Sequence, residues 1–133
     1  MVLNVTQTPR PNLPLRWWMS KAFFYGLFFF IIGHTLAWYG SNLQFISEWW
    51  KQRSLLICCM IAIPTSLMWY FGTRFLMEWS PQLWTMRFIG FSVSYLTFPL
   101  LTWYYLGESP FTLKTILCSL LAFTIVMIQI GMK

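Results

Sequence analysis

The chain contains four long stretches without Asp, Glu, Lys or Arg, and they occupy most of its 133 residues. They cover residues 22–47, 54–73, 88–107 and 115–132, with lengths of 26, 20, 20 and 18 residues. An α-helix needs about 20 predominantly apolar residues to cross the hydrocarbon core of a bilayer. The stretches are continuously apolar and do not alternate, which argues against a membrane β-barrel. The sequence therefore predicts an all-α membrane protein.

The low charge content supports the same class, because only 9% of the residues are charged and 58% are hydrophobic. A soluble domain averages about 25% charged residues, so lipid must cover much of this surface. We predict a single four-helix transmembrane domain over residues 22–133. Short connections make sequential helices antiparallel neighbours, so the expected fold is a bundle of two antiparallel helical hairpins. The four predicted spans lie at about 22–47, 54–73, 84–106 and 111–132.

The segments outside the spans are expected to lie at the membrane interface. Residues 1–21 contain three prolines, which favour extended backbone, and Trp17 and Trp18, a residue type that prefers the headgroup layer. The tail is therefore predicted to be interfacial and not a cleavable signal, because the apolar run after it is too long for a signal core. Residues 74–87 are predicted to hold a second interfacial segment, with Pro81 starting the third helix.

The net charge of +6 predicts orientation, and it does not indicate nucleic-acid binding because no basic run exists to follow a phosphate backbone. Six basic residues fall on one side of the predicted membrane and three on the other. By the positive-inside rule, both termini are expected in the cytoplasm, with the protein in the inner membrane. The bias is small enough to leave a dual-topology population open. The first side has Arg10, Arg16, Lys21, Arg74, Arg87 and Lys133, and the second has Lys51, Arg53 and Lys114.

Each predicted helix has one face of small or hydrogen-bonding residues. In the first helix, a stripe that includes Gly26 and Gly33 is typical of close helix approach in lipid. We expect the polar faces to meet another helix or a polar cavity, because lipid would leave their groups unpaired. A packing interface and a translocation pathway both fit this pattern. The candidate substrate-binding residues on these faces are His34, Trp38, Asn42, Ser66, Arg87 and Gln129.

Two of these candidates have specific alternatives. His34, the one histidine, lies about halfway along the first span, where an ionisable residue is costly and often functional. It either forms a hydrogen bond across a helix interface or takes part in transport. Arg87 either reaches the headgroups, pairs with Glu78, or binds an anion at the mouth of a cavity.

The stretch "YYLGESPFTLKT" between the last two spans is expected to form a helical hairpin turn. Gly107 suits the C-terminal cap of the third helix. Ser109 and Pro110 suit the N-cap and first turn of the fourth helix. Glu108 falls between these caps, so we interpret it as a turn residue and keep a transport carboxylate as the alternative.

The sequence predicts neither an enzyme nor a cofactor or metal site. One histidine, three carboxylates at span ends and no nucleophile motif argue against covalent catalysis. Cys58, Cys59 and Cys118 lie inside predicted spans without metal-ligand spacing, and a buried free Cys behaves as a small hydrophobe.

The segment "RFIGFSVSYLTFPLLTWYYLGESPFTLKTILCSLLAFTIVMIQI" resembles the last helical hairpin of the drug/metabolite transporter superfamily. Gly107, Glu108 and Pro110 carry this resemblance, together with Ser119 and Ala122. The chain as a whole is similar in layout to the small multidrug resistance type. The resemblance implies a four-helix fold that assembles as dimers. The first span lacks the embedded Glu that those proteins use to exchange protons for cations, and His34 is its mid-span polar group.

Two functions follow from these observations. The first is a transporter-like subunit that moves a small metabolite or cation as a dimer. The alternative is a non-transporting structural or accessory subunit of a larger membrane complex. In both cases the expected partners are the lipid bilayer and either a second copy or other membrane subunits.

Overall fold

The computed structural model describes residues 21–131, all of whose regular structure is helical. Residues 1–20 and 132–133 lie outside the described residues, and with them nearly all of the predicted interfacial tail. The elements are α1 Lys21–Asn42, the 3₁₀ helix η2 Leu43–Phe45, α2 Glu48–Gln52, α3 Ser54–Trp79, α4 Leu83–Leu106 and α5 Leu113–Gly131.

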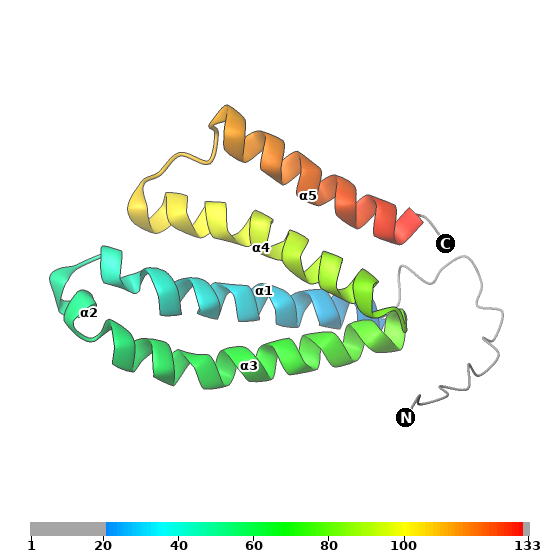
Figure 1. Cartoon of the computed structure of the whole chain (residues 1–133), viewed down its shortest axis with the longest axis horizontal. Coiled ribbons are helices and arrows are strands. Elements are labelled where there is room, and N and C mark those ends of the chain that lie inside the picture. The colour runs from blue at the N-terminus through cyan, green and yellow to red at the C-terminus, as the bar shows by residue number, and fades with distance from the viewer. Residues whose placement is uncertain (1–20, 132–133) are drawn as a thin grey trace, which may run out of the picture.

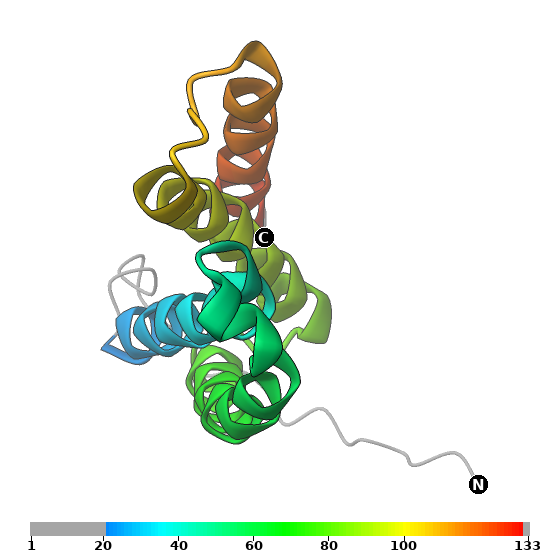
Figure 2. The same ribbon diagram turned by 90° about the vertical axis from the view of Figure 1, so that its left-hand side faces the viewer.

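The four long helices form two antiparallel hairpins, α1–α3 and α4–α5, as the sequence predicts. Their order in space is α3, α1, α4, α5, so that α1 packs against both α3 and α4 (Figures 1 and 2). The start of α1, the end of α3, the start of α4 and the end of α5 share one end of the bundle (Figure 1). We call this the α1-start end. α5 makes most of its contacts with α4 and is the least buried long helix.

Three helices are long and apolar enough to cross a membrane: residues 21–45, 54–79 and 113–131. The chain is therefore assigned as a multi-pass membrane protein. α4 has 24 residues but is not among these candidates; its sequence contains Ser, Thr, Tyr and Trp residues that lower the mean hydropathy. A fourth span at about 84–106 stays a prediction.

The predicted connection at 74–87 is too long, because most of these residues belong to α3 and α4; its position at the membrane interface stays a prediction. α3 continues to Trp79, and only residues 80–82 separate it from α4, which begins at Leu83. The prediction ended the span at the first charge, Arg74. A charged side chain does not interrupt the backbone hydrogen bonds of a helix, and Arg74 and Glu78 lie one turn apart on α3, with Nε and Oε1 separated by 3.9 Å.

The turn between α4 and α5 confirms one predicted cap and contradicts the other. Gly107 adopts the left-handed conformation (φ 71°), and its N–H donates to the carbonyl oxygen of Trp103 at 3.0 Å. α5 begins at Leu113, and Thr112 Oγ1 accepts the N–H of Thr115 at 3.3 Å. Ser109 is therefore not the N-cap; its hydroxyl accepts the N–H of Phe111 at 3.2 Å in a separate local turn. Glu108 is exposed in this turn, as expected for a turn residue.

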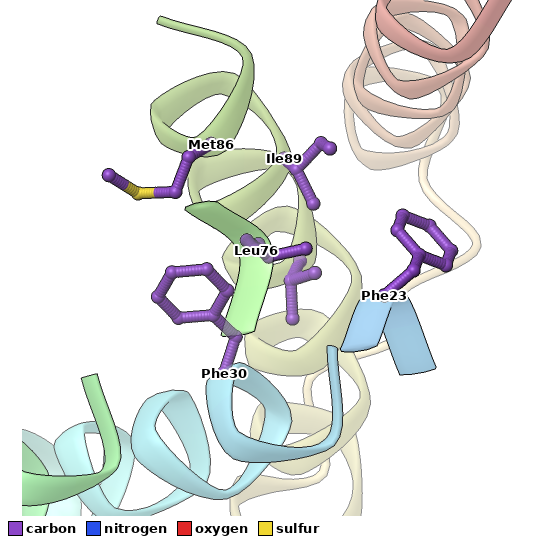
Figure 3. Packing of buried hydrophobic residues seen from close by; sticks show 6 residues of the cluster. Phe23, Phe30, Leu76, Met86 and Ile89 are labelled. Carbon is purple, nitrogen blue, oxygen red and sulfur yellow. The ribbon is translucent and has the colours of Figure 1, made fainter. Parts of the chain in front are cut away.

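The apolar core lies near the α1-start end, where α1, α3 and α4 meet. Leu76 from α3 and Ile89 from α4 are fully buried, and Phe30 from α1 lies beside them (Figure 3). α5 supplies one buried residue, Ala122, on the face that meets α4. The core cluster consists of Phe23, Phe30, Leu76, Met86, Ile89 and Val93.

Candidate functional site: a pocket between α1, α3 and α4

The approach of α1 to α3 depends on glycines. A Cβ atom added at Gly26 would lie 2.6 Å from Leu76 Cγ, and one at Gly33 would lie 2.6 Å from Trp69 Cδ1. Both distances are shorter than carbon atoms tolerate. The small-residue stripe of α1 thus serves the close helix approach that the sequence predicts.

The ring of Phe30 lies between two further glycines, one from each neighbouring helix. A Cβ atom at Gly72 of α3 would lie 3.2 Å from Phe30 Cδ1, and one at Gly90 of α4 would lie 3.4 Å from Phe30 Cζ. This aromatic ring therefore fixes the spacing of α3 and α4 around α1. The pocket lies next to it.

The pocket has a volume of about 190 Å³. Most of its walls are apolar, and one polar side chain comes from each of the three helices: His34 from α1, Thr73 from α3 and Arg87 from α4. The complete lining is Phe30, His34, Trp69, Thr73, Met86, Arg87, Gly90 and Phe91.

His34 joins α1 to α4. Its Nε2 lies 2.9 Å from the carbonyl oxygen of Gly90. A carbonyl oxygen only accepts, so Nε2 carries the proton and Nδ1 is an acceptor in the neutral ring. Aromatic rings surround the imidazole, with centroids 5.8 Å away for Trp69 and 6.1 Å away for Phe98. The predicted hydrogen bond across a helix interface is confirmed, and it leaves one edge of His34 at the pocket.

Arg87 lines the pocket as an exposed side chain. The predicted pairing with Glu78 is wrong, because Glu78 lies on α3 beside Arg74, which is one turn away on the same helix. Within residues 21–131, the ion pairs are Arg74–Glu78 and Lys51–Glu48, and neither includes Arg87. Anion binding and contact with headgroups therefore remain as its two roles.

The other four candidates lie outside the pocket. Trp38 is 1% exposed and donates from Nε1 to Thr102 Oγ1 at 3.0 Å, between α1 and α4. Asn42 donates from Nδ2 to the carbonyl oxygen of Trp38 at 3.0 Å, at the end of α1. Gln129 Oε1 accepts the hydroxyl of Thr85 at 3.0 Å, between α4 and α5. Ser66 is exposed on α3, whereas its neighbour on the same face, Trp69, lines the pocket.

Several hydroxyl groups bond to their own helix. Thr35 donates to the carbonyl oxygen of Ile31, Thr97 to that of Val93 and Thr124 to that of Leu120, each at 2.8 Å. Thr35 and Thr97 lie on the predicted polar faces, so the expectation that such groups need another helix or a cavity is wrong for these two. Ser and Thr can return a hydrogen bond to the backbone one turn earlier, so a hydroxyl on a helix face does not by itself mark an interface.

Most of the pocket walls are not among the candidates predicted from the sequence. Helical spacing places Trp69 and Thr73 on the same face as Ser66, but only Ser66 was named as a candidate on that face. Phe30, Met86 and Phe91 resemble ordinary lipid-facing residues in the sequence. Their role depends on which helix packs against which face, and periodicity does not contain that information.

Comparison with known protein families, curated proteins and solved structures gave no significant match. The resemblance of the last hairpin to the drug/metabolite transporter superfamily therefore stays a prediction. Over residues 21–131, no three His, Cys, Asp or Glu side chains are grouped so as to hold a metal ion.

Proposed function

We propose that this small multi-pass membrane protein is a transporter-like subunit that acts as a homodimer and binds a small metabolite in the pocket between α1, α3 and α4. The observation that carries the proposal is the convergence of His34, Thr73 and Arg87, from three different helices, on one pocket. Ligand sites in helical proteins form between helices and combine apolar walls with a few polar groups. An ionisable residue inside a span is a functional candidate by default.

A substrate pathway requires helices that can change their packing around the pocket. His34 bonds to a backbone carbonyl of α4, and α4 belongs to the other hairpin. A movement of one hairpin against the other would break or remake this bond and open the pocket. The second copy would complete the pathway, since four helices enclose little space by themselves.

Uptake into proteoliposomes tests the proposal. The purified chain is reconstituted and offered a panel of anionic, neutral and cationic metabolites. We expect uptake of at least one class, and His34→Ala should reduce it about tenfold or more, as the loss of a buried polar contact implies. Ser66→Ala is the matched control, because Ser66 is exposed outside the pocket. Equal uptake by wild type and His34→Ala would contradict a role for this pocket.

A second function, a non-transporting accessory subunit, is favoured by one observation. α5 buries only Ala122, so nearly all of this apolar helix is left for lipid or for another membrane protein. Purification in mild detergent separates the two functions: a stoichiometric foreign subunit supports the accessory function, and an isolated homodimer supports the transporter.

The orientation of the chain in the membrane is tested by cysteine labelling. The three native cysteines are replaced, and single cysteines are introduced at residues 47, 80 and 108. One orientation per site would exclude a dual-topology dimer.

A further inference from the structure

We infer that the ligand of this pocket is a small organic monoanion, in which a carboxylate is attached to a compact aromatic or branched apolar body. The inference rests on the proposed function, because it names the substrate class of the same pocket. It depends on the charge, the walls and the size of the site.

The charge of the lining favours an anion. Arg87 is the one charged residue among the lining residues, and its guanidinium presents donors that match a carboxylate in a bidentate geometry. The chain has three carboxylates: Glu48 pairs with Lys51, Glu78 pairs with Arg74, and Glu108 lies in the turn after α4. None of them lines the pocket. A cationic ligand would therefore meet a like charge and no counter-charge.

The other polar groups fit a single anionic group. The Nε2 proton of His34 is used by Gly90. The donors left among the lining residues are the guanidinium of Arg87, the hydroxyl of Thr73 and the indole N–H of Trp69. These donors satisfy one carboxylate. A second anionic group on the ligand would lie against apolar walls, where an unpaired charge is costly.

The walls and the volume favour a compact apolar body. Phe30, Trp69, Met86 and Phe91 supply aromatic and thioether surface, which packs well against a ring. A volume of about 190 Å³ is close to that of an engineered cavity of about 150 Å³ that binds benzene. It is below the roughly 300 Å³ at which pockets for drug-sized ligands begin. The site thus suits a ligand with one ring or one branched chain.

The position of Arg87 gives the ligand an orientation. Arg87 lies four residues after the first residue of α4, about 6 Å along the helix, and therefore near the α1-start end. The carboxylate is expected there. The apolar body is expected to extend toward Trp69 and the ring of His34.

Equilibrium binding to the full chain tests the inference. The protein is placed in nanodiscs of zwitterionic lipid, and radiolabelled benzoate, benzamide and benzylamine are titrated as an anionic, neutral and cationic series of similar size. We expect benzoate to bind most tightly and benzylamine most weakly. Arg87→Gln should weaken benzoate about tenfold or more and leave benzamide unchanged, and Arg87→Lys should recover part of the loss. Arg74→Gln is the control, because Arg74 is exposed, pairs with Glu78 and does not line the pocket.

The outcomes separate this inference from the proposed function. Benzoate binding that depends on Arg87, without uptake of benzoate in proteoliposomes, would support the ligand class and contradict transport. Uptake of a cation, or benzylamine binding at least as tight as benzoate binding, would overturn the ligand class and leave transport standing. A third arm repeats the titration in nanodiscs with anionic lipid. If such lipid abolishes benzoate binding through Arg87, the anion is a lipid headgroup, and the inference of a free metabolite is overturned.

Discussion

α1 packs against two helices in two different ways. Toward α3, the contact is made by glycines and aromatic rings: Gly26 faces Leu76, Gly33 faces Trp69, and the rings of Phe29 and Phe75 stack with centroids 5.6 Å apart. Toward α4, the Phe30 ring also meets Gly90, and three polar contacts bridge the helices. These are His34 with the Gly90 carbonyl, Trp38 with Thr102, and the hydroxyls of Tyr39 and Tyr105.

Two helices in lipid can therefore be held by contacts that differ in how readily they break and form again. Lipid provides little hydrophobic drive between helices, so close packing and hydrogen bonds hold them together. An interhelical hydrogen bond contributes about 0.6 kcal/mol on average, so three of them amount to roughly 2 kcal/mol and can be exchanged singly. A glycine contact depends on shape, and it is lost as soon as the helices separate. We therefore expect α1 and α3 to act as one unit and any movement to occur between α1 and α4, beside the pocket.

The largest effect is expected where the glycine contact is broken. Gly26→Leu places side-chain atoms where Leu76 already lies, and Leu76 is 0% exposed, so it has no free space to enter. Overpacking typically costs about 1–3 kcal/mol, and we expect the upper end of this range or loss of folded protein. Unfolding in SDS, followed by circular dichroism, measures the change. Gly131→Leu is the control, since a Cβ atom there meets nothing within 4 Å; similar stability for both variants would contradict a glycine-dependent α1–α3 unit.

A smaller effect is expected where one polar bridge to α4 is removed. Trp38→Phe and Thr102→Val each break the 3.0 Å hydrogen bond, and a double-mutant cycle isolates its contribution. We expect a coupling free energy of about 1 kcal/mol, between the membrane average of about 0.6 and the maximum of about 1.7 kcal/mol, because Trp38 is almost fully buried.

The control cycle pairs Thr102→Val with Trp84→Phe. Trp84 is 74% exposed at the start of α4, so no coupling is expected there. A coupling at Trp38 no larger than at Trp84 would show that shape, and not hydrogen bonding, also governs the α1–α4 contact.

The α4–α5 contact should be weaker still. Thr85 Oγ1 lies 3.0 Å from Gln129 Oε1 and 3.1 Å from Gln82 Oε1. One hydroxyl donates one hydrogen bond at a time, so after Gln129→Leu it can donate fully to Gln82. We expect a destabilisation of about 0.5 kcal/mol or less, measured by the same unfolding assay. With Gln82→Ala in the background, the cost of Gln129→Leu should rise, and an unchanged cost would contradict this sharing.

A helical pattern in a sequence predicts some features of this fold and not others. The four stretches without charged residues located every long helix. The glycine stripe of α1 and the cap at Gly107 were also recognisable, because each depends on local backbone geometry. Arg74 misplaced one boundary, because hydropathy detects the end of a lipid-compatible stretch and not the end of a helix. Ser109 and Thr112 are both acceptable N-caps, and the choice between them depends on the geometry of the whole turn.

The pocket was the least predictable feature. His34, Trp38 and Asn42 lie on one arc of α1, so the sequence grouped them, yet only His34 lines the pocket. Helical periodicity predicts which side of α1 a residue faces. It does not predict where along the axis of α1 the pocket lies. Arg87 and Thr73 join His34 through the order of the helices in space, which requires knowing that α1 lies between α3 and α4.

The smallest effect is expected at hydroxyls that bond to their own helix. Thr35 follows His34 directly on α1, and its hydroxyl donates to the carbonyl oxygen of Ile31 at 2.8 Å. Thr35→Val keeps the shape and removes a group that needs no partner from α3 or α4, so we expect a change within about 0.5 kcal/mol and unchanged ligand binding. The unfolding assay and the benzoate titration measure both. A loss of more than about 1 kcal/mol in the free energy of unfolding would mean that the hydroxyl bonds to a neighbouring helix. The distinction between a side of α1 held by shape and a side held by hydrogen bonds would then not hold at Thr35.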